Sequence, residues 1–240
     1  MNSGFLRTLL DDASRPFYGS GRFAYHYSRG KLSSDCIFRE VLKRGIFPAE
    51  ARFLDLGCGQ GSLFAWLLAA RKLYEQGQWP GDWAAPPKPL SLRGVELMQK
   101  DVERAARAFG SNHPVVSIRQ GDMCETDFGR ADVVTILDAL HYIDHARQRD
   151  VLARIRAALP PGGLFLTRVG DAGAGLPYHL CNWVDHAVTF VRGHRLPALY
   201  GRKLGEWVDL LRSLGFQVES LPMSEGKPFA NIMLVARVPV

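Results

Sequence analysis

The stretch FLDLGCGQGS, residues 53–62, places three glycines at alternate positions directly behind a short apolar run. Glycine loses more conformational entropy on folding than any other residue, so packing alone rarely selects three of them together. The apolar run indicates a buried strand, and Ser62 begins a segment with helical periodicity. A glycine turn between a strand and a helix lets a ligand approach the backbone, beside the free N–H groups of the helix. We therefore expect a ligand site at this turn.

The segments on either side alternate between strand and helix patterns, which predicts an α/β fold with a doubly wound sheet. The expected strands are residues 52–56, 92–96, 115–119, 132–137, 164–169, 216–221 and 232–238. Helical periodicity is found at residues 62–74, 102–109, 151–159 and 204–215. The tight spacing of the last two strands predicts an antiparallel hairpin at the sheet edge. The sheet is thus expected to have seven strands, mostly parallel, with an antiparallel last strand.

Three segments do not fit this alternation. Residues 1–50 precede the first strand, and we expect them to form an N-terminal helical arm or cap. Residues 76–90, QGQWPGDWAAPPKPL, are rich in Pro, Gly and Trp and are expected to be a loop. Residues 170–201 form a long insertion that we expect to act as a lid. The predicted organisation is an arm, 1–50, followed by one domain, 51–240, that carries the lid.

Composition limits the class of protein. With 240 residues, 47% of them hydrophobic, the chain can bury a full core, and its apolar stretches are too short to span a bilayer. Asp11 and Asp12 interrupt any secretory signal, so we expect a cytoplasmic protein. The four cysteines lie far apart without a C-x-x-C pair, which predicts free thiols in a reducing compartment and no metal site.

The net charge of +6 raises the question of a nucleic-acid partner. The basic residues are spread along the chain rather than gathered in a run, and a dispersed basic surface is the simpler interpretation. We therefore expect a small-molecule substrate and no nucleic acid. The sequence does not indicate an oligomeric state.

The spacing of the glycines separates two kinds of ligand. A dinucleotide-binding turn follows the pattern G-x-G-x-x-G, whereas here the third glycine comes one residue early. Asp55 also precedes the first glycine by two positions, where an acid suits a pyrophosphate poorly. It suits a cationic ligand, such as one with an ammonium or sulfonium group. Alternatively, Asp55 simply caps the following helix.

Two further acids follow the next strands. Glu96 ends the second expected strand, where a carboxylate can accept both hydroxyls of a ribose, unless it is a solvated strand end. Asp122 follows the third strand and can accept from an exocyclic amine, although Gly-Asp is also an ordinary turn pair. The carboxyl ends of parallel strands meet at one edge of a sheet, so we expect these acids to converge on one crevice.

At this point the chain resembles the class I S-adenosylmethionine-dependent methyltransferases. The motifs that carry the resemblance are FLDLGCGQGS, RGVEL, RQGDM, ADVVTILDALHYI and VLARIRAALPPGGLFL. They occur in the family's order over roughly residues 50–170. The resemblance implies a Rossmann-like fold, S-adenosyl-L-methionine (SAM) as cofactor and S-adenosyl-L-homocysteine (SAH) as product.

The resemblance also assigns cofactor contacts. It implies that Asp55 and the turn hold the methionine part, Glu96 the ribose, Asp122 with Met123 the adenine, and Asp138 the junction with the substrate. The full expected cofactor set is Asp55, Gly57, Cys58, Gly59, Gly61, Glu96, Leu97, Asp122, Met123, Asp138 and, from the arm, Arg29.

A sulfonium methyl group is already activated, so the enzyme mainly aligns a nucleophile and excludes water. His141, just past the fourth strand, is the candidate base, against a packing or substrate-orienting role. The segment Tyr25–Lys31 offers aromatic faces and two cations, and it is either a cover over the cofactor or a solvated loop. The residues expected to bind substrate are Tyr25, Tyr27, Tyr142 and His186.

Within the lid, an apolar stripe from Leu180 to Val191 indicates a helix that either packs or lines a pocket. The leading hypothesis is methyl transfer to an oxygen or nitrogen of an aromatic or acyl metabolite. An RNA or DNA methyltransferase is the second, although the fourth strand ends in LDALHY and not in the N/D-P-P-Y/F run of amino-methylating enzymes. An inactive binding protein with this fold is a third, from a different class.

Overall fold

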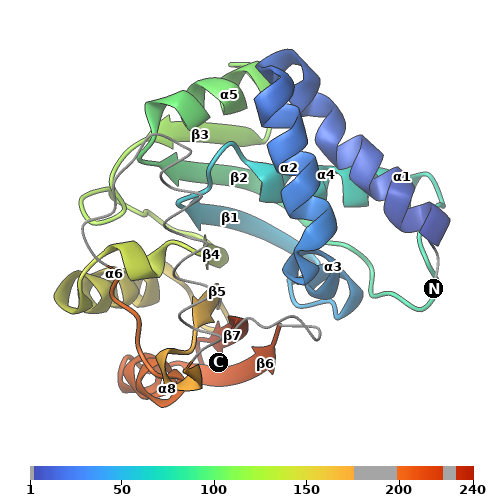
Figure 1. Ribbon diagram of the computed structural model, residues 1–240. Coiled ribbons are helices and arrows are strands. Elements are labelled where there is room, and N and C mark those ends of the chain that lie inside the picture. Colours follow the sequence, from blue (N-terminus) through green and yellow to red (C-terminus); the bar gives the residue numbers. More distant parts are fainter. Residues whose placement is uncertain (1–2, 176–198, 224–230) are drawn as a thin grey trace. The chain divides into compact units, whose positions relative to one another are not determined.

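The computed structural model describes residues 3–175, 199–223 and 231–240. Its strands are β1 Glu50–Leu56, β2 Lys88–Glu96, β3 Val116–Gln120, β4 Val133–Leu137, β5 Leu164–Gly170, β6 Gln217–Pro222 and β7 Asn231–Arg237. They form one sheet in the order β3-β2-β1-β4-β5-β7-β6 (Figure 1). β1, β2 and β3 pair in parallel, whereas β7 is antiparallel to β5 and β6. The expected seven-stranded α/β sheet with an antiparallel last strand is confirmed.

The chain folds as two compact units. The first contains the residues up to Asp127 together with Ala131–Val133, and the second contains Phe128–Arg130 and the residues from Val134 onward. The N-terminal arm lies in the first unit, as do the ends of β1, β2 and β3. The end of β4 and both stems of the long insertion lie in the second.

The helices of the first unit are α1 Ser3–Ser14, η1 Arg15–Ser20, α2 Arg22–Ser34, α3 Cys36–Lys43, α4 Ser62–Glu75 and α5 Gln99–Phe109. The arm is therefore helical, and Tyr25–Lys31 belongs to α2 instead of a solvated loop. Figure 1 shows α1 and α2 side by side, with α4 next to them. Buried apolar side chains, among them Leu9, Phe17 and Leu32, hold the arm in this position.

Strand β2 begins earlier than expected, at Lys88, so the last part of the Pro-rich segment is not a loop. Lys88 N–H donates to Ala49 O at 2.7 Å, and Lys88 and Pro89 then pair with the start of β1. The sequence hid this extension because Pro is poorly suited to a strand interior; here the register shifts at this point of the pairing. The preceding loop packs on α1 through Phe5, whose ring centroid lies 5.2 Å from that of Trp79.

The helices of the second unit are η2 Leu140–Tyr142, α6 His145–Ala158, η3 Ala172–Ala174 and α8 Leu204–Ser213. Helix α6 starts six residues before the expected Val151. Asp144 determines this start, because its carboxylate accepts from the N–H groups of Ala146 and Arg147. Most of the expected lid, including its apolar stripe, His186 and Cys181, lies outside the described residues.

Candidate functional site

The glycine turn joins β1 to α4 and has the backbone conformation that its sequence predicts. Gly57, Gly59 and Gly61 have φ values of 74°, 57° and 84°, which L side chains rarely adopt. The N–H groups of Gly57 and Cys58 donate to Val95 O at 2.8 and 3.3 Å, so the start of the turn is fixed to β2. The turn therefore lies beside the carboxyl ends of both strands.

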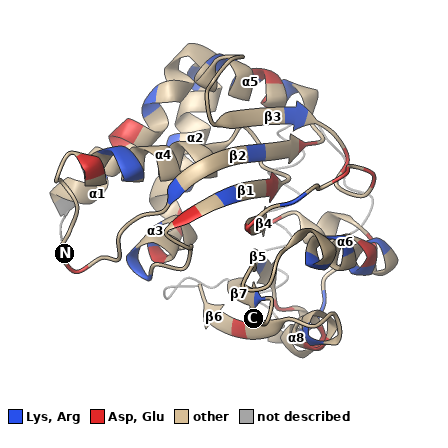
Figure 2. Ribbon diagram, turned by 180° about the vertical axis from the view of Figure 1, so that it is seen from behind, with Lys and Arg blue, Asp and Glu red and all other residues tan. Residues whose placement is uncertain are grey.

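Acidic side chains occupy these strand ends. Asp55 and Glu96 are only 3% and 7% exposed, and Figure 2 shows acidic residues at the tips of β1 and β2. The Glu96 carboxylate accepts from Gly59 N–H at 2.7 Å and from Met98 N–H at 2.9 Å. Glu96 is thus held by backbone amides and is not a solvated strand end. Its orientation depends directly on the shape of the turn.

The end of β3 joins the same edge. Gly121 N–H donates to Glu96 O at 3.0 Å, and Gln120 Nε2 donates to Leu97 O at 3.2 Å. Asp122 follows at once, half-buried, with one carboxylate oxygen accepting from Cys124 N–H at 2.8 Å. Leu97 is 60% exposed and Met123 is half-buried. The structure thus brings the residues that were expected to bind the cofactor, from Asp55 to Met123, to the same edge of the sheet.

The electrostatic character of the turn is acidic. Burial, followed by the charges of Asp55, Glu96 and Asp101, raises the pKa of the Cys58 thiol well above its usual value. Cys58 is therefore a neutral thiol at physiological pH and no nucleophile. The same potential that disfavours a thiolate favours a positively charged ligand. This observation fits a sulfonium or ammonium group at the turn.

Two glycines of the turn have different surroundings. A Cβ built on Gly61 would lie 2.8 Å from Ile118 Cδ1 and 2.8 Å from Phe109 Cε2. A Cβ built on Gly59 would meet no atom of the described residues within 4 Å. Gly61 is therefore required by packing against β3 and α5. Packing does not explain Gly59, which lies open at the point where a ligand would approach.

On α2, the expected substrate and cofactor residues already have partners. Tyr25 stacks on Tyr18 with ring centroids 4.1 Å apart, and Tyr27 stacks on Phe23 at 5.8 Å. The Arg29 guanidinium pairs with Asp11 at 2.6 Å and donates to Ser14 Oγ at 3.1 Å. In this arrangement Arg29 holds α1 to α2.

In the second unit, Asp138 directly follows β4 and is the non-glycine residue with a positive φ, 60°, among the described residues. Its carboxylate receives hydrogen bonds from both Nε and Nη2 of Arg168, which projects from β5 and is 8% exposed. A strained backbone held by a partly buried ion pair is typical of functional positions. Arg168 was not among the site residues expected from the sequence. The signal was a cation inside an otherwise buried apolar strand, FLTRVG.

His141 lies two residues beyond Ala139 in η2, half-buried. Burial lowers its pKa to about 4, while Asp138 acts to raise it and Arg168 to lower it. The ring is therefore neutral at physiological pH and a weak base. Tyr142, 37% exposed, lies against it with ring centroids 4.2 Å apart.

The C-terminal stem of the long insertion returns to the same segment. Tyr200 N–H donates to His141 O at 2.8 Å. The buried Gln148 amide donates to the carbonyls of Leu140 at 3.1 Å and of Tyr200 at 2.8 Å. The described residue Tyr200 is therefore fixed beside His141. His186 itself lies outside the described residues.

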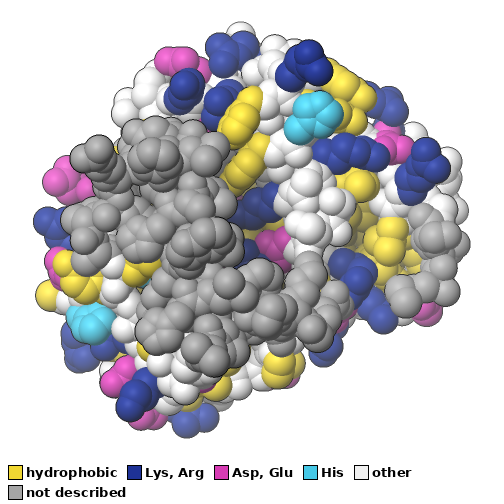
Figure 3. All heavy atoms as spheres, viewed as in Figure 1, with side chains coloured by type: hydrophobic (Ala, Val, Ile, Leu, Met, Phe, Trp, Pro, Cys, Tyr) yellow, Lys and Arg dark blue, Asp and Glu magenta, His cyan; other side chains and the backbone are white. Residues whose placement is uncertain are grey.

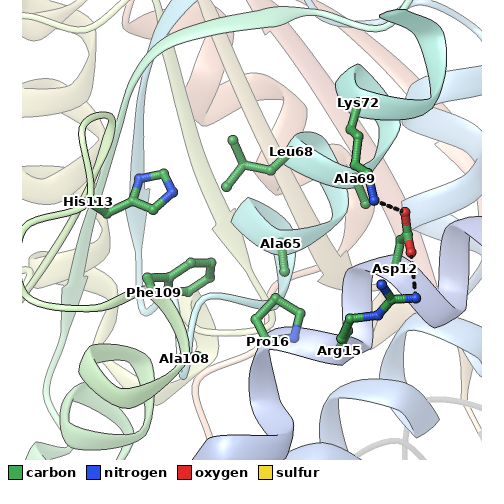
Figure 4. Close-up of a pocket in the computed structure, with 10 residues that line it drawn as sticks. All are labelled: Asp12, Arg15, Pro16, Ala65, Leu68, Ala69, Lys72, Ala108, Phe109 and His113. Atoms are coloured by element: carbon green, nitrogen blue, oxygen red, sulfur yellow. Dashed lines mark hydrogen bonds and ion pairs between the residues drawn. The ribbon is translucent and has the colours of Figure 1, made fainter. Parts of the chain in front are cut away.

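A cavity of about 360 Å³ lies between η1, α4 and α5 (Figure 4). Its walls are mostly apolar, and none of the expected site residues lines it. The carboxylate of Asp12 is shared by two cations, since it pairs with Lys72 at 2.7 Å and with Arg15 at 3.1 Å. This cavity is separate from the strand ends and is not the candidate site.

Residues 54–165 match the family model of a methyltransferase domain. The carboxy-S-adenosyl-L-methionine synthase of Chromohalobacter salexigens is 30% identical over 118 residues, which are 48% of this chain and 38% of that protein. The chain therefore spans well under half the length of this curated relative. Residues 54–165 contain the ends of β1, β2, β3 and β4.

Solved structures are similar in fold. An O-methyltransferase family protein from Burkholderia thailandensis has a TM-score of 0.61 at 19% identity, over 91% of this chain and 59% of its own. The magnesium protoporphyrin IX methyltransferase of Synechocystis PCC 6803, solved with bound SAH, has a TM-score of 0.57 at 17% identity, over 95% and 93%. At such identities the likeness concerns the fold, and it agrees with the seven-stranded sheet.

Proposed function

We propose that this chain, whose residues 54–165 match the family model of a methyltransferase domain, is a class I S-adenosylmethionine-dependent methyltransferase that transfers the methyl group of SAM to a small-molecule acceptor. The observation that carries the proposal is the acidic, glycine-lined strand edge of the first unit. There Asp55 and Glu96 are buried, and Gly59 lies open to a ligand. A cationic sulfonium compound with a ribose suits this edge in charge and in hydrogen-bonding groups.

The residues have distinct proposed roles. Asp55 and the turn bind the methionine part, Glu96 accepts from the ribose hydroxyls, and Asp122 with Met123 binds the adenine. Leu97, 60% exposed at the end of β2, supplies an apolar face for the base. Asp138 lies at the junction between cofactor and acceptor. Arg29 is held by Asp11, so a contact with the cofactor carboxylate requires it to exchange that partner.

SAM supplies an activated methyl group, and the protein's part is alignment and exclusion of water. A histidine with a pKa of about 4 is poorly matched to removing a proton at neutral pH. We therefore assign His141 to orienting the acceptor by a hydrogen bond rather than to general-base catalysis. Tyr142, Tyr25, Tyr27 and His186 stay the proposed substrate-binding residues.

A ligand panel tests the proposal. Thermal unfolding is followed with SAM, SAH and NAD at equal concentrations, and isothermal titration calorimetry gives the dissociation constants. We expect stabilisation by SAM and SAH and none by NAD, because a ligand stabilises only the state that it binds. Absence of stabilisation by both SAM and SAH would overturn the proposal.

Incubation with SAM and acceptor panels then identifies the reaction. Mass spectrometry detects SAH if a methyl group is transferred. It detects carboxy-SAM if the chain instead catalyses the reaction for which its relative from Chromohalobacter salexigens is named. Nucleic acids form a separate arm of the panel. The net charge of +6 favours including them, but basic side chains are dispersed on the face shown in Figure 3. We expect methylated small molecules.

A further inference from the structure

A network of buried polar side chains joins the arm to the glycine turn. Gln60, 2% exposed, donates from Nε2 to Ala24 O at 2.7 Å and to Ser28 Oγ at 2.6 Å. The Ser28 hydroxyl, fully buried, lies 2.7 Å from that of Ser62, the first residue of α4. Helix α2 thus contacts the turn through directional bonds.

The two halves of the turn are held by different elements. The backbone of residues 57–59 is bonded to β2, through Val95 O and the Glu96 carboxylate. The side chains of Gln60 and Ser62 are bonded to α2. The sheet therefore fixes the first half of the turn. The second half, where α4 begins, depends on the arm.

This network is not what stability alone would select. Burying an amide and two hydroxyls costs free energy, and apolar side chains of similar size often stabilise a core as well or better. Among the described residues, Gln60 Oε1 has no hydrogen-bond partner, which adds to this cost. What polar networks supply instead is orientation, because each bond fixes one geometry.

We propose that Ser28 and Gln60 are positioning residues, which hold residues 60–62 in the conformation that receives the cofactor. Cofactor affinity then depends on whether α2 is seated on the turn. If these residues relax, binding must order them again, and the apparent dissociation constant becomes the intrinsic one divided by the fraction of molecules that have the competent turn. The inference rests on the proposed function, since it assumes a cofactor at the turn.

The test compares two variants of the network with a control variant that removes a different contact of the arm. Ser28→Ala and Gln60→Met remove the bonds to the turn. Lys72→Met removes the ion pair between α4 and Asp12 of α1, which does not touch the turn. For each, calorimetry gives the dissociation constant of SAH, and the melting temperature is measured without ligand.

We expect SAH affinity to fall about tenfold or more in Ser28→Ala and Gln60→Met, and to stay within about twofold in Lys72→Met at a similar melting temperature. Ser28→Thr, which keeps the hydroxyl, should regain most of the affinity. Unchanged SAH affinity in both network variants would overturn the inference. So would a loss in Lys72→Met as large as theirs, since that would indicate general destabilisation.

Amide hydrogen exchange of residues 59–64 without ligand provides a second readout that needs no cofactor. Exchange there should be faster in Ser28→Ala and Gln60→Met than in Lys72→Met. If the wild type bound no SAH, the proposed function would fail, and the exchange rates would still show whether α2 orders the turn. Equal exchange rates in all three variants would overturn that ordering itself.

Discussion

The end of β2 and the end of β4 each carry an acid, but the two acids are held in different ways. Glu96 is oriented by the backbone N–H groups of Gly59 and Met98, whereas Asp138 is oriented by the guanidinium of Arg168. Around Cys58 the nearby charges all act in the same, negative direction. Around His141 the charges of Asp138 and Arg168 oppose each other. The first end suits a cation, and the second suits a neutral group.

The largest effect is expected from a change at Asp55, one of the acids beside the glycine turn. Asp55→Asn removes a buried charge at the turn while keeping the shape of the side chain. We expect SAH binding to weaken about a hundredfold or more, equivalent to about 2.7 kcal/mol, with the fold intact by circular dichroism. Calorimetric titration measures the affinity.

The matched control is Asp132→Asn, at the opposite end of the same sheet region. Asp132 binds Arg52, which lowers the pKa of its carboxyl, and its loss should reduce stability without changing SAH affinity. If Asp55→Asn binds SAH as the wild type does, Asp55 has no part in the site.

The next effect separates ligand approach from packing within the turn. Asn tolerates a positive φ, so Gly59→Asn adds a side chain with little backbone strain. It should weaken SAH binding about ten- to a hundredfold and leave stability nearly unchanged, because the new Cβ meets none of the described atoms.

Gly61→Asn should do the reverse of the Gly59 change. Its Cβ would lie 2.8 Å from Ile118 Cδ1, which requires side chains in the core to shift. We expect a loss of about 1–3 kcal/mol in the free energy of unfolding by urea titration. Equal losses of stability in the two variants would mean that the whole turn exists for packing.

A loss of similar size to that of Gly59→Asn is expected from Glu96→Gln, which removes the charge but keeps one carbonyl oxygen to accept from the backbone. SAH affinity should fall by about 1.5–3 kcal/mol, the scale of a charge-assisted hydrogen bond. Adenine alone, titrated as a fragment, should bind both proteins equally if Glu96 serves the ribose. A weaker affinity for adenine as well would place Glu96 elsewhere in the site.

The strand ends of the first unit could be predicted because local rules and topology agree there. A glycine turn behind a buried strand has few alternatives, and parallel strands bring their carboxyl ends to one edge. Asp55, Glu96 and Asp122 could therefore be placed from their positions in the chain. The insertion at residues 76–90 accounts for the long stretch of chain between Gly61 and Glu96.

What could not be predicted depends on contacts between distant parts of the chain. Nothing in the sequence near Gln60 indicates that α2 supplies its partners, over 30 residues away. The pairing of Arg168 with Asp138 likewise spans 30 positions. The helical structure of Tyr25–Lys31 could not be decided because its composition also suits a solvated loop, and tertiary packing determines the outcome.

The smallest effect is expected at the end of β4, where the charges of Asp138 and Arg168 oppose each other around His141. Burial lowers the pKa of His141 to about 4, below the value of about 6.5 that an unfolded chain would show. Between these pH values the unfolded chain binds a proton that the folded chain does not, so acid favours unfolding. The stabilising contribution of a neutral His141 is complete above about pH 6.5 and is lost as the pH falls toward 4.

From pH 7 to pH 5 the wild type should therefore lose about 1–2 kcal/mol more stability than His141→Gln, measured by urea unfolding at both pH values. His26→Gln, a change at an exposed histidine of α2, should behave as the wild type does. Arg168→Met should raise the pKa of His141, since Arg168 acts to lower it, and nuclear magnetic resonance titration of the ring detects the change. If wild type and His141→Gln lost equal stability between pH 7 and pH 5, the ring would not be held neutral by burial, and a role as general base would regain support.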